Sequence, residues 1–259
     1  MTDPAGPPLL ALDDDGVATI TLRRPAHLNR LHREDLVAIE SHLAAVAADP
    51  RVRALVLTGQ GRAFCAGYHI GELDESDAAA TEGPQRFERT VDALEALPMP
   101  TIARLNGSVY GGATDLALAC DFRVGVASME LRMPAARLGL HYYPGGMRRY
   151  VSRLGLAAAK RMFLLAESWP AEALLRIGYL DALVEPAMLD EAVAALVGAL
   201  AANAPLAVRG MKLSLDEIAR GEFEVARLRE REAACAASRD LREGLAAFAE
   251  RRAPRFEGR

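Results

Sequence analysis

Two glycine-containing turns are the sequence features best suited to chemistry. The first, "AFCAGYHI", places Gly67 directly before Tyr68. The second, "YGGATDLALACD", places Gly111 and Gly112 at the start of an apolar run of helical length. Because glycine has no Cβ, a ligand oxygen can approach the main chain of such a turn closely. The first amides of a helix also lack an intrahelical partner and favour an anion. Each turn therefore offers a main-chain N–H to an anionic oxygen.

Two such amides converging on one oxygen would suit a thioester carbonyl. That oxygen becomes negative in an enolate or a tetrahedral intermediate, and each donor then contributes roughly 2.7–4 kcal/mol. The alternative is two ordinary turns without a ligand, but the pair is more specific than either turn alone. A nucleotide site is excluded, because in "TGQGRAFCAG" no G-x-G-x-x-G pattern leads into a helix.

A single carboxylate, Asp115, follows Gly112 by three positions. A carboxylate is costly in an apolar segment unless it has a partner. Asp115 can contact the substrate as a proton carrier. It can also act as a cap in the first turn of the helix, where the helix dipole stabilises an acid by roughly 0.3–1 kcal/mol. The sequence leaves both interpretations open.

These motifs resemble those of the crotonase, or enoyl-CoA hydratase/isomerase, superfamily. "AFCAGYHIGEL" is similar to its first oxyanion motif and "NGSVYGGATDLALACDFRVG" to its second. "RPAHLNRL" resembles its N-terminal motif, "RLGLHYYPGGMRRYVSRLG" its active-site wall and "DLREGLAAFAERRAPRF" its C-terminal signature. The likeness runs from about residue 16 to the end of the chain. It implies an α/β fold, a spiral of ββα units with a helical C-terminal region that forms trimers or dimers of trimers.

The resemblance also implies roles for individual residues and an acyl-CoA substrate. The oxyanion amides would come from Tyr68 and Gly112, and the catalytic side chains would be Asp115 and Tyr142. The residues implied to bind the substrate are Ala26, Leu28, Ala66, His69, Ile70, His141 and Tyr143. We expect no metal and no separate cofactor, since coenzyme A is part of the substrate.

The sequence departs from the hydratase pattern at both catalytic carboxylates. Hydratases of this family carry two glutamates, whereas this chain has Asp115, shorter by one methylene, and Ala135. Paired carboxylates have a clear role in hydration, because water must be held and its hydrogens delivered. A displacement near 1 Å can cost on the order of 10²-fold in rate. We therefore expect a family member that stabilises a thioester enolate, without efficient two-glutamate hydration.

Two other functions stay open. Family members that decarboxylate malonyl-type thioesters have a Gly-x-x-Tyr pattern that matches Gly139 and Tyr142. Their histidine, however, directly follows the first-motif glycine, where this chain has Tyr68 and then His69. The second alternative is a catalytically weak acyl-CoA binder that kept the fold. Retention of both glycine turns favours chemistry over binding alone.

Alternating strand and helix patterns must position these motifs. Short apolar or β-branched runs predict strands over residues 16–25, 53–61, 101–107 and 121–127. Apolar spacing predicts a helix over 33–49, and the alternation indicates an α/β protein. The small, polar segment 73–85 predicts a surface loop. Helical patterns dominate the last third, which predicts a core with the acyl-CoA site over 1–195 and a helical region over 196–259.

The composition limits the classes of binding partner that the protein can have. The 259 residues are 51% hydrophobic and 25% charged, which is typical of a globular protein. With 31 basic and 35 acidic residues, nothing favours nucleic acid or an anionic membrane. The three cysteines form no metal-ligand pattern and fit a reducing compartment. No apolar stretch approaches the roughly 20 residues of a membrane span, and the N-terminus lacks a signal-peptide pattern. We expect a cytoplasmic homo-oligomer.

Overall fold

The structure is a computed structural model that describes residues 5–69, 71 and 78–259. Its larger sheet has six strands in the order β1-β2-β3-β5-β7-β10, antiparallel between β1 and β2 and parallel elsewhere. The bounds of these strands are β1 Gly6–Leu12, β2 Val17–Arg23, β3 Ala54–Gly59, β5 Thr101–Leu105, β7 Phe122–Val126 and β10 Ala182–Val184. All four predicted strands are present.

A smaller sheet has the order β4-β6-β8-β9. Its strands are short: β4 Ala63–Cys65, β6 Ser108–Tyr110, β8 Glu130–Arg132 and β9 Ser168–Pro170. Three strands of the large sheet are each followed by a strand of the small one and then by an α-helix, as β3-β4-α2, β5-β6-α3 and β7-β8-α4. These helices are α2 Ala78–Glu95, α3 Ala113–Leu118 and α4 Pro144–Leu154. The predicted α/β spiral of ββα units is confirmed.

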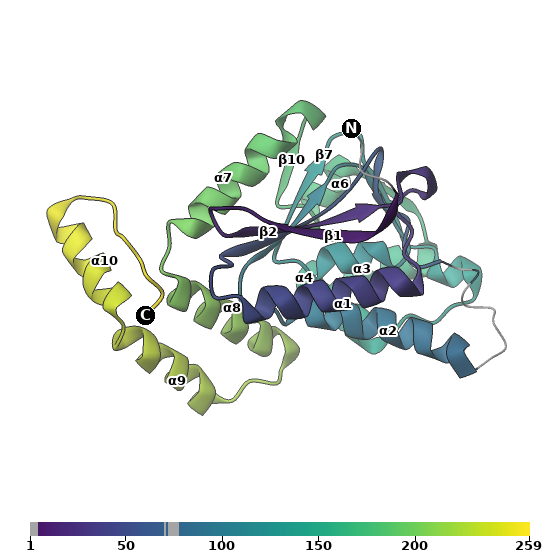
Figure 1. The fold of residues 1–259 in the computed structure, drawn as a ribbon. Coiled ribbons are helices and arrows are strands. Elements are labelled where there is room, and N and C mark those ends of the chain that lie inside the picture. The colour runs from purple at the N-terminus through teal and green to yellow at the C-terminus, as the bar shows by residue number, and fades with distance from the viewer. Residues whose placement is uncertain (1–4, 70, 72–77) are drawn as a thin grey trace.

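Helices cover both faces of the large sheet (Figure 1). The predicted helix over 33–49 is α1, Arg33–Ala48, on one face, and α7, Leu189–Ala201, lies on the other. The remaining helical segments are η1 Pro25–His27, η3 Ala135–Leu138, α5 Leu156–Lys160, η4 Arg161–Leu165, α6 Ala171–Arg176, η5 Pro186–Met188, α8 Pro205–Arg220, α9 Val225–Ala236 and α10 Arg239–Glu250. The last two helices, α9 and α10, stand away from the sheets (Figure 1). The predicted boundary between residues 195 and 196 falls inside α7.

The prediction of a surface loop over 73–85 is wrong in its second half. Residues 78–85 belong to α2, while residues 73–77 lie outside the described residues. The helix begins in a run of three alanines, the residue type with the highest helix propensity. Small residues are common in loops, but alanine also loses no side-chain entropy in a helix.

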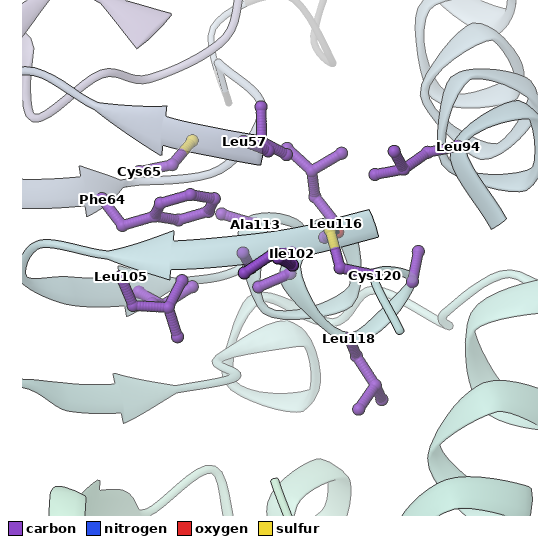
Figure 2. Packing of buried hydrophobic residues seen from close by; sticks show 14 of the residues in the cluster. Leu57, Phe64, Cys65, Leu94, Ile102, Leu105, Ala113, Leu116, Leu118 and Cys120 are labelled. Atoms are coloured by element: carbon purple, nitrogen blue, oxygen red, sulfur yellow. Dashed lines mark hydrogen bonds between the residues drawn. The ribbon is translucent and has the colours of Figure 1, made fainter. Parts of the chain in front are cut away.

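The short helix α3 runs through the middle of the core, and all of its residues are buried. Figure 2 shows Leu116 near Leu57 of β3, Ile102 of β5 and Leu94 of α2, with Cys120 beside them. The apolar run after Gly112 is thus explained by burial on every side. Any charged side chain on this helix must find its partner inside the protein.

Among the described residues, no single helix has the length and apolar character of a membrane span. The pair Pro186–Ala201 and Pro205–Arg220 passes that test of length and composition together, with a bend of 104° between its halves.

Candidate active site

The two glycine turns lie against one another. Gly67 has a φ of +86°, a conformation that glycine adopts without strain. An alanine there would place its Cβ 2.8 Å from the Tyr110 carbonyl oxygen and 3.0 Å from the Gly112 nitrogen. Within the described part of the chain, no acceptor bonds the Gly112 N–H. The glycine at 67 therefore allows the amide of Gly112 to approach the turn that carries Tyr68.

Main-chain hydrogen bonds tie the first turn to the N-terminal motif. The Ala66 amide donates to the Leu28 carbonyl at 2.8 Å. The Leu31 amide donates to Gly67 at 2.8 Å, and the His69 amide donates back to Leu31 at 2.9 Å. Residues 28–31 and 66–69 thus run side by side, and the turn is held on both sides of Gly67.

Hydrogen bonds of the Asn29 side chain also hold the N-terminal motif against the segment before the first turn. Asn29 is buried and has a φ of +55°, a conformation that asparagine tolerates better than most residues. Its side-chain amide donates to the carbonyls of Gln60 at 2.8 Å and Ala63 at 2.9 Å, and its oxygen accepts from the Arg24 amide at 2.9 Å. The Cys65 thiol donates to the Asn29 carbonyl at 3.0 Å, and burial raises its pKa to about 12.

The predicted substrate-binding residues fall into separate groups. Leu28 and Ala66 are partly exposed beside the first turn, and Ala26 is exposed in η1 just before them. The His69 ring lies 4.7 Å from the ring of His32. Ile70 lies outside the described residues. His141 is exposed, and its Nδ1 lies 2.8 Å from the Tyr142 carbonyl oxygen.

Asp115 is fully buried and forms an ion pair with Arg149 of α4. Arg149 Nε donates to Oδ1 at 3.0 Å and Nη2 to Oδ2 at 2.7 Å, while the Tyr143 hydroxyl also donates to Oδ2. The carboxylate therefore bonds two side chains of the wall, and none of its bonds runs to the first turn of α3. Asp115 does lie in the first turn of α3, where no side chain forms a cap hydrogen bond, so its stabilisation by the helix dipole stays a prediction.

Arg149 is itself fully buried and joins α3 and α4 to α2. Its Nη1 donates to Asp92 Oδ1 at 2.7 Å and to Glu95 Oε2 at 3.2 Å. Burial alone would lower the pKa of Arg149, but the hydrogen bonds and charge of Asp115 outweigh it and raise that pKa. Burial would likewise raise the pKa of Glu95, but Arg149 and its neighbours on α4 hold it below its usual value.

Aromatic rings fill the space between the wall and the turns. Tyr142 stacks on Tyr143 with 4.3 Å between ring centroids, and its hydroxyl donates to that of Tyr143 at 3.3 Å. Phe87 of α2 meets Tyr143 at 6.0 Å and Tyr68 at 6.3 Å. Its ring also covers Gly112, where a Cβ would lie 2.8 Å from Phe87 Cζ. Phe87 thus links the wall to both turns.

Burial also affects the two wall tyrosines. It raises the pKa of Tyr142 and of Tyr143 well above 10, and the charge of Asp115 acts in the same direction. Both phenols are therefore protonated hydrogen-bond donors at neutral pH. Tyr142 and Tyr143 are partly exposed, whereas Asp115 is not.

Two residues that form the site escaped the sequence analysis: Arg149 and Phe87. Their residue types are common on helices, and each belongs to a helix far from its partners in sequence. One signal for Arg149 existed, because a buried carboxylate at position 115 demands a cation. The candidate cations in "GGMRRYVSRLG" are three arginines, and the sequence does not say which one faces inward.

Residue 135, where hydratases carry their second glutamate, is a buried alanine at the start of η3. Among the described residues, no group of three or more His, Cys, Asp or Glu side chains could hold a metal ion. The chemistry available at this site consists of main-chain amides, two phenols and a buried ion pair.

Comparisons with known proteins agree with this architecture. The family model "Enoyl-CoA hydratase/isomerase" matches residues 13–259. Crotonyl-CoA hydratase of Syntrophomonas wolfei is 31% identical over 94% of this chain and 95% of that protein. The 2,3-dehydroadipyl-CoA hydratase of Escherichia coli is 32% identical over 94% and 96%. The crystal structure of enoyl-CoA hydratase from Bacillus anthracis superposes with a TM-score of 0.91 at 26% identity, over 98% of this chain and 100% of that one. This chain belongs to the enoyl-CoA hydratase/isomerase family.

Proposed function

We propose that this protein acts on an acyl-CoA thioester and stabilises its enolate with the N–H groups of Tyr68 and Gly112. The observation that carries the proposal is the contact between the two turns, with only 3.0 Å between a Cβ placed on Gly67 and the Gly112 nitrogen. Two amides held this close can bind one oxygen as it becomes negative. Relatives named for hydration of crotonyl-CoA and 2,3-dehydroadipyl-CoA support an unsaturated acyl chain.

Among the reactions that pass through this enolate, a shift of the double bond fits the side chains better than hydration. Position 135 is an alanine, and Asp115 is fully buried with hydrogen bonds to both oxygens. These two positions therefore provide no pair of carboxylates to hold a water. A double-bond shift only moves a proton between two carbons of the acyl chain, which a single proton-carrying group can do.

Product analysis of the purified protein tests this choice. Crotonyl-CoA, a 3-enoyl-CoA and methylmalonyl-CoA are incubated separately and followed by liquid chromatography with mass spectrometry. We expect the 3-enoyl-CoA to become an isomer of equal mass and different retention. Addition of water to crotonyl-CoA, without that isomer, would favour hydration, and loss of carbon dioxide from methylmalonyl-CoA would favour decarboxylation. Tight binding of all three without turnover would identify a binding protein.

We also propose that α8, α9 and α10 assemble the chain into a trimer or a dimer of trimers. Large apolar side chains are exposed there, among them Met211, Leu215, Leu245 and Phe248, the last 87% exposed. None of the residues of α9 is buried. Contiguous exposed apolar surface marks a protein interface. Light scattering of the purified protein should give the mass of three or six chains, and the substitution Phe248→Asp should lower that mass. A monomeric native protein would contradict the assembly.

The proposed chemistry uses only groups of the chain and the thioester, with coenzyme A entering as part of the substrate. Dialysis against a chelator, with unchanged turnover as the expected result, tests the absence of a metal requirement.

We also propose a cytoplasmic location, which the sequence alone suggests. Fluorescence of a tagged chain in cells tests this location.

A further inference from the structure

The side chain between the buried carboxylate and the aromatic space is Tyr143. Asp115 has no exposed surface, and its carboxylate accepts hydrogen bonds from Arg149 and from the Tyr143 hydroxyl. Tyr143, by contrast, is partly exposed. Of the two residues joined by this hydrogen bond, Tyr143 is the one with surface that a substrate can reach.

Asp115 is also fixed in place. Arg149 holds it with two hydrogen bonds of 3.0 and 2.7 Å, and the other end of the guanidinium bonds Asp92 and Glu95 of α2. Rotation of the Asp115 carboxylate toward the substrate would break a buried, bidentate ion pair, which is strongly unfavourable. The carboxylate therefore acts on its neighbour and not directly on the substrate.

The ring of Tyr143 is held equally well. Tyr142 stacks on one face at 4.3 Å, and Phe87 meets it edge-on at 6.0 Å with an interplanar angle of 66°. Phe87 also covers Gly112 and lies 6.3 Å from the Tyr68 ring. Phe87 therefore connects the Tyr143 ring to the two turns proposed to hold the thioester oxygen.

We propose that Tyr143 is the catalytic residue that carries the proton to and from the acyl chain, with Asp115 as the acceptor of the phenol's own proton and Arg149 as the positioning residue. The inference rests on the proposed function, since it assigns the proton transfer of that same enolate chemistry. It changes the role predicted for two residues: Tyr143 from substrate binding to proton transfer, and Asp115 from direct proton carrier to partner of the phenol.

The step balances without a further reactant. The C–H bond next to the thioester carbonyl breaks, and its proton passes to the phenol oxygen of Tyr143. The proton that the phenol already carried moves to Asp115 Oδ2 along their hydrogen bond. The electron pair of the C–H bond enters the enolate, whose oxygen lies at the two amides. The reverse transfer, at the γ carbon of the acyl chain, restores the carboxylate and completes the double-bond shift.

Hydrogen exchange in deuterated water tests the relay. A saturated thioester, butyryl-CoA, reports on removal of the proton next to the carbonyl, and a 3-enoyl-CoA reports on turnover. Tyr143→Phe keeps the ring contacts and removes only the hydroxyl. We expect kcat and the exchange rate to fall by about 10²–10⁴-fold with little change in KM, the range of general acid–base catalysis. Asp115→Asn, which cannot take the second proton, should lose a similar factor.

The matched control is Tyr179→Phe. Tyr179 is a buried tyrosine whose hydroxyl donates to the Thr114 carbonyl of α3 at 2.8 Å, so it supports the same helix without touching the carboxylate. We expect its kcat to stay within about threefold of the native value. If Tyr143→Phe or Asp115→Asn exchanged hydrogen at the native rate and kept full activity, the relay would be wrong and the proposed function would still stand. A native protein that neither exchanges nor turns over any thioester would overturn the proposed function and the relay with it.

Discussion

The glycine turns and the α4 wall meet at Phe87 but are built from different atoms. The turns present main-chain amides, held by main-chain hydrogen bonds between residues 28–31 and 66–69. The wall presents the side chains of Tyr143 and Arg149, whose partners are side chains of α2 and α3. A site made of main-chain amides is therefore retained when most of the residues around it change type. A site made of side chains changes its chemistry when one of those residues bonds a different partner.

The two regions also differ in how deeply their ion pairs are buried. Beside the turns, the Cys65 thiol is neutral, since burial raises its pKa to about 12, and the ion pair of Arg24 with Asp35 keeps the Arg24 side chain 20% exposed. The wall contains a buried ion network centred on Arg149 and Glu95. We therefore expect substitutions in the wall to change stability through unpaired charge, and substitutions in the turns to change catalysis through displaced amides.

The largest effect should follow the removal of the central cation. Arg149→Met leaves the Asp115 carboxylate buried without its cation, and we expect the free energy of unfolding to fall by about 3–5 kcal/mol in urea denaturation. Arg148→Met is the control, because Arg148 also pairs with Glu95 but is 28% exposed and does not contact Asp115. Its loss should be about 1 kcal/mol or less. Equal losses would show that the pairing with Asp115 is unimportant.

An effect of similar size, on activity instead of stability, should follow the addition of a Cβ in the first turn. Gly67→Ala would place its Cβ 2.8 Å from the Tyr110 oxygen and 3.0 Å from the Gly112 nitrogen, and so push the two turns apart. We expect kcat/KM to fall by about 10²–10³-fold, as when one oxyanion donor is lost. Gly178→Ala shares the positive φ, +74°, but meets no atom within 4 Å. Gly178→Ala should lower the stability and leave kcat/KM unchanged. An equal loss of kcat/KM in Gly178→Ala would show that the effect is not specific to the two turns.

A smaller effect should appear in acid. The arginines of α4 hold the pKa of Glu95 below its usual value of 4.5. Its ionised form therefore contributes stability above about pH 4.5, and that contribution is lost as pH falls through the lower folded pKa. Between about pH 5 and about pH 3, the free energy of unfolding should fall more steeply in the native protein than in Glu95→Gln. Parallel pH profiles would show that Glu95 contributes nothing to this dependence.

The smallest effect concerns two buried thiols. Cys65 and Cys120 are buried, and burial raises the pKa of each to about 12. Since the thiolate is the reactive form, iodoacetamide should leave both unmodified in the folded protein and modify both in urea. Peptide mass spectrometry identifies the sites. Rapid modification of Cys65 without unfolding would mean that the backbone around Gly67 opens in solution.

Parts of this molecule could be predicted because their cause is local. Gly67, with its positive φ, marks a turn that most other residues would strain, and this signal is visible in the residue type itself. The strands followed from short apolar runs in the same way. The start of α2 was missed because its first residues are small, and small residues are common in loops as well as in helices.

The wall could not be predicted to the same depth. Asp115 needed a cation, but "MRRYVSR" contains three arginines, and only the crossing of α3 and α4 selects Arg149. Tyr142 and Tyr143 are adjacent in sequence, yet only Tyr143 contacts the carboxylate with its hydroxyl. Phe87 comes from α2, whose packing over Gly112 no local pattern indicates.

The sequence alone determined the α/β class and the two glycine turns, because hydrophobic periodicity and main-chain conformation depend on neighbouring residues. The spiral of ββα units came from the resemblance of the motifs to a known family. The tertiary structure decided that the Asp115 carboxylate is buried with Arg149 and that a tyrosine stands in front of it. The physical reason is that ion pairing and burial depend on distances between helices far apart along the chain, and these distances exist only once the core has packed.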